Sequence, residues 1–509
     1  MHRRDFIRYL ISGALLSAAA RLGITNGKVW ADSPSIYDVV IIGGGLSGLT
    51  AAVAMKGHNI LVLEKEADMG ERIVSKSWEG FSYSLGASYI GKPDSDMRGF
   101  FREIGLTSKP FPVPPPQDAL AINEKIYPDE YSDQAFGSLK EIQDYVRASR
   151  ELYQLAQKGI GDAVYEVDLE TLSGFSNLDA LTVEQWLNQR NIGPIVQQFI
   201  NTENRGLFGS SNADLSLLYN VPEMAFNLYA GDYMPQHFKK RSVPDFMNYV
   251  PERGSGKDGI WTFTHGMIEM IWAMEQQPNL HGKLETGADV QHVSVNPDKT
   301  VDIIYIRHGR SRKVKAYAVV LASPAPVTAR IVGNGLSARV MSALENVTYV
   351  PYVTMGVFMK RRLFNNAWNI ACLDTAFSTL NDAIRTHVDY EYDGKSILGI
   401  AMPPMNAQDA SLTRLSDDQL FARAMADVER YFPGASKYVI DKYIHRFRYG
   451  FPVFAPGYTK ILNTIHQDAT AKGPLFLAGD YTVYPILGGA AVSGERAAEN
   501  VAQYMEEIG

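Results

Sequence analysis

Short runs of consecutive apolar residues near the N-terminus predict buried β-strands. Residues 39–42 and 60–63 contain no polar position, which is typical of parallel strands covered on both faces. Residues 46–55, between the two runs, are small and apolar and predict a helix. The pattern therefore predicts a strand–helix–strand unit.

Similar patterns return further along the chain. Residues 475–478 predict a buried strand, and residues 488–504 predict a helix that opens on small residues. Residues 284–295 and 353–359 predict further strands, whereas residues 130–253 have helical periodicity without strand-like runs. We therefore predict an α/β fold in which pieces of one sheet are separated by a largely helical segment.

The first strand–helix–strand unit contains three glycines in its turn and an acidic residue at the end of its second strand. Gly43, Gly45 and Gly48 form a G-x-G-x-x-G motif between strand and helix, and Glu64 ends the second strand. These glycines permit a tight turn, close approach of a pyrophosphate and close helix–strand packing. Ser47 lies in the first turn of the helix, whose free N–H groups attract phosphate. The unit predicts a dinucleotide site, and Glu64, accepting ribose hydroxyls, argues against a 2′-phosphate.

Length and composition set the broad class. The chain has 509 residues, which favours two domains, and its 46% hydrophobic and 21% charged residues are typical of a soluble globular protein. A net charge of −7 and the lack of a basic stripe predict no nucleic-acid partner. The single cysteine, Cys372, excludes an intramolecular disulfide, and the ten histidines show no ligand spacing, so we expect no metal.

The N-terminus predicts a targeting segment. Arg3 and Arg4 precede an apolar stretch at 9–20, too short to span a bilayer, and small residues favour cleavage after Ala31. Residues 1–31 therefore resemble a twin-arginine signal peptide, with a general secretory signal as the alternative. We predict recognition by the twin-arginine export machinery, a periplasmic or exported location, and no stable membrane span in the mature chain.

The segment 81–91 (FSYSLGASYIG) adds a resemblance. Together with the glycine motif, it resembles the flavin-containing amine oxidase family, in the monoamine oxidase and phytoene desaturase-like superfamily. The resemblance implies that Arg72 contacts the diphosphate of FAD and that Ser88 lies beside the flavin. Glu71 replaces the second glycine of the family's Gly-Gly-Arg sequence.

The C-terminal unit resembles the last flavin-binding unit of the same family. Gly479 and Asp480 follow the strand, and the resemblance implies that Asp480 accepts hydrogen bonds from the ribityl or phosphate side of FAD. Backbone N–H groups from Leu487 to Ala490 would face the flavin, where the helix dipole stabilises negative charge. Val290, in the predicted strand 284–295, is implied to meet the adenine.

The resemblance also implies the domain organisation. We expect a two-domain, glutathione-reductase-like FAD-binding fold with a mixed α+β substrate domain. The FAD-binding domain is expected to comprise residues 36–95, 260–330 and 460–509, and the substrate domain residues 96–259 and 331–459. Because Cys372 lies far from the usual attachment segment, FAD should be bound without a covalent link.

Three residues are candidates for the catalytic groups. Many relatives carry a lysine near the flavin, and the register places Thr354 there, with no lysine between Lys315 and Lys360. His265 replaces a glycine of the family, either as a proton-transfer group or, as we favour, as a structural residue. Tyr89, in the segment beside the flavin, is the third candidate.

These observations predict an FAD-dependent oxidoreductase of the amine oxidase type. It would move hydride from a C–H bond of a small-molecule substrate, an amine or an amino acid, to flavin N5, with reoxidation by oxygen. The alternative is an FAD-dependent desaturase or isomerase of a lipid-like or polycyclic substrate, favoured by Thr354 and by Ile486 before the last helix. A third class is a protein that holds FAD without turnover.

Overall fold

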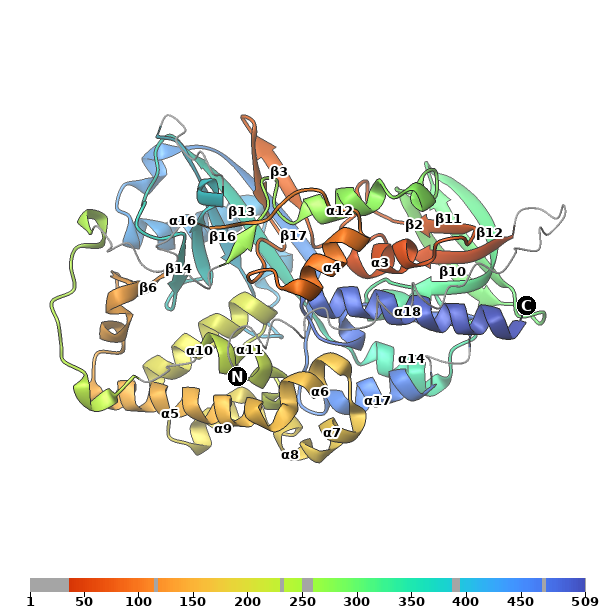
Figure 1. Ribbon diagram of the computed structural model, residues 1–509. Helices are drawn as coiled ribbons and strands as arrows, with labels where there is room; N and C mark the ends of the chain where they lie inside the picture. Colours follow the sequence, from red (N-terminus) through yellow and green to blue (C-terminus); the bar gives the residue numbers. More distant parts are fainter. Residues whose placement is uncertain are drawn as a thin grey trace.

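The computed structural model describes residues 36–113, 118–228, 233–249, 260–386, 394–468 and 473–508. The predicted signal peptide, residues 1–31, lies outside the described residues. Two seven-stranded sheets lie towards opposite ends of the molecule, and a group of helices runs beneath them (Figure 1).

The first sheet is mixed, with parallel strands at its centre. Its strands are β10 (Ala288–Val295), β11 (Val301–Arg307), β12 (Arg310–Leu321), β1 (Tyr37–Ile42), β2 (Ile60–Leu63), β9 (Leu284–Glu285) and β18 (Leu475–Leu477). β1 is parallel to β2 and β12, and β18 is parallel to β12. The N-terminal and C-terminal units of the chain thus meet in one sheet.

Helices cover both faces of this sheet. They are α3 (Leu46–Ala54), α4 (Ser95–Glu103), α12 (Ile268–Glu275), α13 (Ala325–Ile331), α14 (Ala338–Glu345), α17 (Tyr458–Asp468) and α18 (Leu487–Ile508). Along β1, Val39 and Ile41 join one apolar cluster, whereas Val40 and Ile42 join another. The strand is therefore buried on both faces, as its unbroken apolar run predicts.

One predicted strand is divided. We predicted a continuous strand at 284–295, but the chain forms β9 and β10 with a turn between them. Gly287 in this turn has φ +64°, a left-handed conformation that interrupts the strand. The prediction of a single strand at 284–295 is therefore wrong, because a turn divides the segment into β9 and β10.

The second sheet belongs to the middle of the chain. Its strands, in spatial order, are β17 (Val439–Pro452), β13 (Tyr349–Met359), β16 (Ser396–Met402), β15 (Thr379–Asp382), β14 (Asn369–Cys372), β6 (Asp118–Ile122) and β7 (Lys125–Pro128). β13 pairs antiparallel with both β16 and β17. Two small ribbons pair β3 (Ser75–Trp78) with β4 (Phe81–Ser84), and β5 (Phe111–Pro112) with β8 (Trp261–Thr262).

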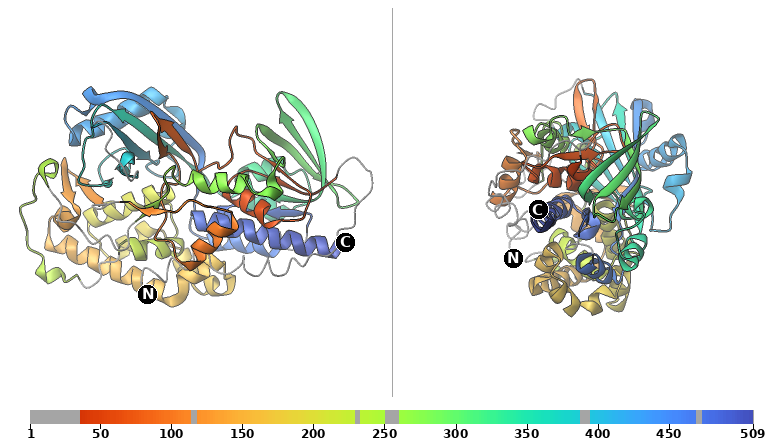
Figure 2. Two further views of the ribbon diagram at one scale, coloured as in Figure 1. Left: turned by 45° about the horizontal axis from the view of Figure 1, so that its top comes forward. Right: turned by 90° about the vertical axis from the view of Figure 1, so that its right-hand side faces the viewer.

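The remaining helices form the layer beneath the sheets, apart from two that pack on the second sheet. The layer comprises α5 (Leu139–Leu155), α6 (Gly161–Glu166), α7 (Leu169–Gly174), α8 (Ser176–Asp179), α9 (Val183–Gln189), α10 (Pro194–Phe208) and α11 (Leu217–Asn227) (Figures 1 and 2). The other two are α15 (Ser411–Arg414) and α16 (Asp417–Tyr431). The prediction of helices without strands at 130–253 is confirmed for the described residues of that range, 130–228 and 233–249.

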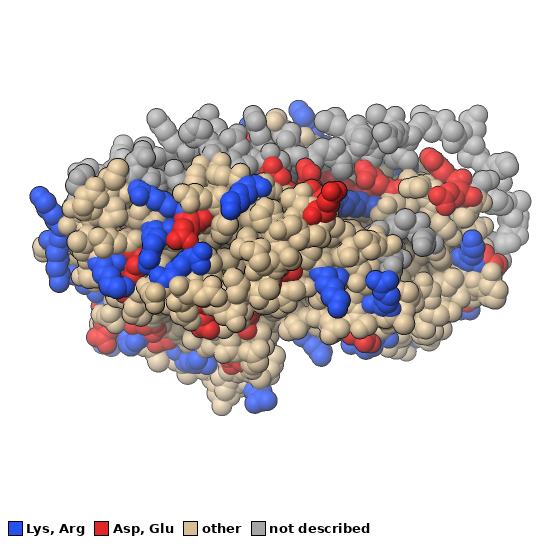
Figure 3. Space-filling model, turned by 90° about the horizontal axis from the view of Figure 1, so that it is seen from below, with Lys and Arg blue, Asp and Glu red and all other residues tan. Residues whose placement is uncertain are grey.

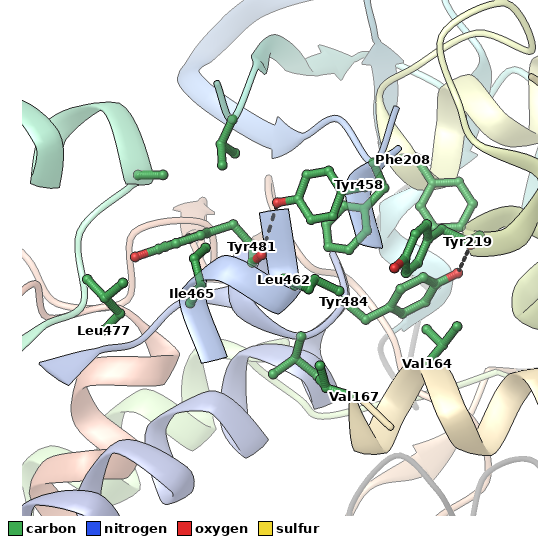
Figure 4. Close-up of a cluster of buried hydrophobic side chains, with 14 of the residues drawn as sticks. Val164, Val167, Phe208, Tyr219, Tyr458, Leu462, Ile465, Leu477, Tyr481 and Tyr484 are labelled. Atoms are coloured by element: carbon green, nitrogen blue, oxygen red, sulfur yellow. Dashed lines mark hydrogen bonds between the residues drawn. The ribbon is translucent and has the colours of Figure 1, made fainter. Parts of the chain in front are cut away.

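A buried cluster of tyrosines ties this helical layer to the C-terminal unit. The Tyr458 hydroxyl donates to the carbonyl of Tyr481 (2.9 Å), and the Tyr484 hydroxyl donates to the carbonyl of Tyr219 on α11 (2.7 Å), as Figure 4 shows. All four side chains are almost completely buried. These contacts fix the loop between β18 and α18, which carries several candidate site residues.

Basic and acidic side chains are interspersed on the face in Figure 3. Within the described ranges, no helix is both long and apolar enough to cross a bilayer. The same residues contain no cluster of three or more potential metal ligands.

Candidate cofactor and substrate site

A cavity of about 480 Å³ is lined by residues next to the first sheet and by residues of the second sheet. One end is lined by the β1–α3 turn, residues 83–91 and the start of α18. The other end is lined by α10, α11 and strands of the second sheet. We call these the cofactor end and the substrate end.

The β1–α3 turn at the cofactor end requires its glycines. Gly43 has φ +112°, and a Cβ there would lie 2.6 Å from the carbonyl oxygen of Ala322. A Cβ on Gly48 would lie 2.0 Å from the carbonyl oxygen of Gly43. α3 begins after Gly45 without a side-chain cap, which leaves its first N–H groups for an anion. Gly45 and Ser47 both line the cavity.

Glu64 is held at the end of β2 by two backbone groups. The N–H of Gly44 donates to its Oε2 (2.6 Å), and the N–H of Glu66 donates to its Oε1 (2.8 Å). Burial raises the pKa of Glu64, and these two N–H groups oppose the shift. The N–H of Ala288 donates to the Glu64 carbonyl, so Val290 on β10 lies close to this strand end. Neither Glu64 nor Val290 belongs to the cavity lining.

Arg72, near the N-terminal glycine motif, forms an ion pair with Asp480 in the C-terminal unit. Its Nη1 lies 2.6 Å from Oδ2 of Asp480, and its Nη2 lies 3.5 Å from Oε2 of Glu71. Burial lowers the pKa of Arg72, but the carboxylates of Asp480 and Glu71 outweigh it and raise the pKa above its usual range. Gly479 precedes Asp480 with φ +141°, a conformation that favours glycine.

Glu71 occupies an unusual backbone position. It has φ +51°, in the left-handed region that a glycine enters without steric cost. Its carboxylate approaches Gly45, whose added Cβ would lie 3.2 Å from Oε2 of Glu71. Burial raises the pKa of Glu71, and Arg72 opposes the shift. Glu71, at the position where the family has a glycine, thus places its carboxylate beside the N-terminus of α3.

The start of α18 and the 83–91 segment complete the cofactor end. Leu487, Gly488 and Ala490 line the cavity, directly after Ile486. Ser88 also lines it and donates its hydroxyl to the carbonyl of Gly86 (2.9 Å). The glycine turn, the uncapped helix and the Arg72–Asp480 pair at the cavity, with Glu64 behind the turn, supply hydrogen-bond donors and acceptors that fit the adenosine, diphosphate and flavin parts of FAD.

The three catalytic candidates lie in different surroundings. Thr354, on β13, lines the cavity, and its buried Oγ1 has no hydrogen-bond partner among the described residues. Tyr89 lines the cavity and packs edge-on against Trp368, with ring centroids 5.5 Å apart. His265 is exposed, lies outside the cavity lining, and contacts Trp272 with the two rings tilted by 53°. We therefore do not assign His265 a catalytic role.

Two acidic residues at the substrate end escaped the sequence analysis. Glu203 on α10 and Glu223 on α11 both line the cavity. Burial raises the pKa of each to about 7, with Asp118 adding to the shift at Glu203 and a hydrogen bond from Tyr165 opposing it at Glu223. The available signal was a carboxylate on an otherwise apolar helix face: Glu203 follows Ile200 by one turn.

Comparisons with known proteins agree with this geometry. Residues 46–502 match the family described as flavin containing amine oxidoreductase. A probable flavin-containing monoamine oxidase A of Dictyostelium discoideum is 37% identical over 78 residues, which span 15% of this chain and only 17% of that protein. The 15-cis-phytoene desaturase of Synechococcus elongatus is 21% identical over 496 residues, covering 92% of this chain and 97% of that one.

The fold is also that of a solved amine oxidase. Cyclohexylamine oxidase from Brevibacterium oxydans superposes with a TM-score of 0.67 at 15% identity, covering 93% of this chain and all of the other. Because the family match spans far more than half of its length, the chain belongs to the family of flavin-containing amine oxidoreductases, which are FAD-dependent oxidoreductases.

Proposed function

We propose that this protein oxidises amines with FAD as its cofactor. The observation that carries the proposal is a single cavity that joins the FAD-compatible cofactor end to a substrate end with two carboxylates, Glu203 and Glu223. Carboxylates in a substrate cavity attract cationic amines and repel carboxylate-bearing substrates. This charge pattern favours amines over amino acids among the two substrate classes that we considered.

The chemistry that FAD supplies when bound is the two-electron oxidation of a substrate C–H bond. The residues of the chain would orient the substrate and exclude water. Tyr89 and Trp368 form an aromatic wall, and Thr354, whose hydroxyl has no partner in the described part of the chain, offers it to a substrate nitrogen or a water molecule. Arg72, Asp480 and the N-terminus of α18 would hold the cofactor.

We further propose non-covalent attachment in a two-domain, glutathione-reductase-like arrangement with the boundaries given above. Cys372 supports the first point, since it is fully buried on β14 and does not line the cavity. The two separate sheets support the second. Reoxidation by oxygen is part of the proposal and rests on the family resemblance alone.

Export by the twin-arginine machinery to the periplasm remains a proposal from residues 1–31. Arg3 and Arg4 support it, as does the need to bind a nucleotide cofactor before export. Fractionation of expressing cells would test it: replacing both arginines with lysine should abolish the exported form, whereas a general secretory signal would tolerate the change.

The second candidate function is desaturation or isomerisation of a lipid-like substrate. Ile486 favours it, because an apolar side chain lines the cavity directly before α18, as does the full-length similarity to a phytoene desaturase. Glu203 and Glu223 argue against it, because a hydrocarbon would desolvate both carboxyl groups and offer neither a hydrogen bond nor a cation.

An anaerobic reduction screen separates these functions. Purified holoenzyme is mixed with primary amines, amino acids or a polyene, and the flavin absorbance is followed. Bleaching by amines, with peroxide released when air is admitted, is the expected result. Bleaching by the polyene alone would support the second function. Bleaching by no compound would leave a protein that only binds FAD.

A further inference from the structure

Two asparagine side chains line the cavity from interior strands of the second sheet. Asn369 on β14 and Asn381 on β15 are cross-strand partners, and both belong to the cavity lining. Cross-strand partners have Cβ atoms about 5 Å apart on the same face of a sheet, so one ligand group can reach both amides. Each of the two strands has a neighbour on either side. The asparagines therefore form a pair in the sheet wall of the cavity.

The folded chain leaves most of the hydrogen-bonding capacity of this pair unused. Among the described residues, the only hydrogen bond of the two side-chain amides runs from Nδ2 of Asn369 to Oδ1 of Asp118, and it is long, at 3.4 Å. Both asparagines are half-buried rather than packed into the core. Asparagine is depleted in β-strands, so two of them side by side on interior strands break the local preference. Such a departure is expected at a binding site.

The neighbouring strands fix the place of the Asn381 amide. Its partner on β16 is Gly399, whose own partner on β13 is Gly356. A Cβ on Gly399 would lie 2.0 Å from Oδ1 of Asn381, so the amide lies directly over this glycine. The ring of Tyr83 occupies the space over Gly356, where an added Cβ would lie 2.5 Å from it. The amide is therefore held in position by the row of small residues beside it.

The sheet wall around the pair offers uncharged polar groups. Thr379 and Thr354 line the cavity on the same face, and both are partners of Ala401 in the next cross-strand row. An asparagine amide presents a donor and an acceptor in one plane. A carboxamide on a ligand presents the complementary donor and acceptor, whereas a hydrocarbon presents neither. The pair is therefore suited to a carboxamide.

We propose that Asn369 and Asn381 bind a carboxamide group of the substrate, remote from the amine that is oxidised. This inference rests on the proposed amine oxidation and specifies a second group of its substrate. Asn381 donates to the carboxamide oxygen and accepts from its N–H, and Asn369 adds a hydrogen bond from its free N–H. An alkyl group in the same place would desolvate both amides without pairing them, which disfavours substrates that lack the carboxamide.

The test compares two amines of equal shape in the wild-type holoenzyme. 5-Aminopentanamide carries the carboxamide, and 5-methylhexylamine carries an isopropyl group of similar size in its place. Anaerobic stopped-flow reduction of the flavin gives, for each amine, the limiting rate constant divided by the dissociation constant. We expect this value to be about 10- to 100-fold higher for the amide, the range for two hydrogen bonds.

Substitutions assign that preference to the two asparagines. Asn369→Leu and Asn381→Leu keep the side-chain shape without the hydrogen bonds, and each should lower the amide-to-alkyl ratio by about 10-fold. Gly399→Ala keeps Asn381 but displaces its amide, so it should lower the ratio as well. Asn346→Leu is the matched control, because Asn346 is exposed at the end of α14 and lies outside the cavity lining. It should leave the ratio unchanged. Retained flavin and an unchanged value for 5-methylhexylamine identify the variants that are correctly folded.

The results separate this inference from the proposed function. Equal values for the two amines in the wild type, or a ratio that neither Leu variant lowers, would overturn the carboxamide subsite and leave amine oxidation intact. If no amine reduces the flavin, the proposed function falls, and titration calorimetry of the holoenzyme with 5-aminopentanamide decides the subsite. Binding that is lost in both cavity variants but kept in Asn346→Leu supports it, and absence of wild-type binding overturns it.

Discussion

Charged side chains are paired at the cofactor end of the cavity, whereas the carboxylates at the substrate end have no cationic partner among the described residues. At the cofactor end, Arg72 lies between Asp480 and Glu71, and just outside the cavity lining backbone N–H groups hold Glu64. At the substrate end, Glu203 and Glu223 face the cavity without a cation from the described residues. The first arrangement is organised before any ligand binds, whereas the second is completed only by a ligand. The difference predicts that substitutions which break the preformed contacts of the cofactor end destabilise the protein and that charge removal at the substrate end stabilises it.

The largest effect should follow Gly48→Ala at the cofactor end. The added Cβ would lie 2.0 Å from the carbonyl oxygen of Gly43, so the helix must move away from the turn. We expect a loss of about 3 kcal/mol or more in unfolding free energy, together with loss of FAD. Chemical denaturation and the ratio of flavin to protein absorbance measure both.

The matched control for this change is Gly99→Ala on α4. A Cβ there meets no atom within 4 Å, and alanine is the better helix former. This variant should retain FAD and be slightly more stable. Equal stability and FAD content in the two variants would show that the turn does not require glycine at residue 48.

The second prediction concerns the ion pair that joins the two ends of the chain. Arg72→Met leaves the Asp480 carboxylate, whose side chain is only 5% exposed, without its cation. We expect the unfolding free energy to fall by about 2 kcal/mol and FAD binding to weaken. The loss is smaller than for a fully buried ion pair because the Arg72 side chain is 27% exposed. A double-mutant cycle with Asp480→Asn isolates the pair, and additive losses would contradict the coupling.

The same contrast explains what could be predicted from the sequence. The β1–α3 turn depends on local backbone geometry, so Gly43, Gly45 and Gly48 carry their signal within a few residues of one another. The apolar runs of β1 and β18 likewise predict strands buried on both faces, and both lie in the first sheet. Local chemistry of this kind is readable without knowing the tertiary structure.

The substrate end could not be predicted in the same way. Glu203 on α10 and Glu223 on α11 line one cavity only because of how these helices pack in the folded chain, and neither sequence segment carries a motif. Residue 265 was ambiguous for a related reason, since a histidine beside a glycine turn is compatible with either a site or a surface position. Its exposure and its contact with Trp272 follow from the packing of α12.

The third prediction concerns the pH dependence of stability at the substrate end. Burial raises the pKa of Glu203 and of Glu223 from 4.5 to about 7, so the folded protein binds protons that the unfolded chain has released between these values. Unfolding free energy should therefore fall as pH rises through this window. Gln cannot ionise, so Glu203→Gln should be more stable than wild type by about 1–2 kcal/mol at pH 8, with the difference vanishing near pH 4.

Thermal unfolding of the two Gln variants across this pH range measures the effect. Glu223→Gln should behave similarly, although losing the hydrogen bond from the Tyr165 hydroxyl offsets part of its gain. A variant that is less stable than wild type at pH 8 would mean that the carboxylates are compensated after all, and the contrast between the two ends would be lost.

The smallest effect should come from Glu71→Gly, which tests whether the cofactor end is fully optimised. Glycine adopts the left-handed φ of +51° without steric cost, and its greater freedom in the unfolded chain cancels part of the gain. Removing the carboxylate near Gly45 also removes a negative charge from the region that should hold the FAD diphosphate. We expect a gain of about 0.5 kcal/mol in stability and several-fold tighter FAD binding, measured by fluorescence titration of the apoprotein. Weaker FAD binding would instead assign Glu71 a positioning role through Arg72, and Glu71→Gln, which keeps the shape without the charge, would then separate the charge from the backbone conformation.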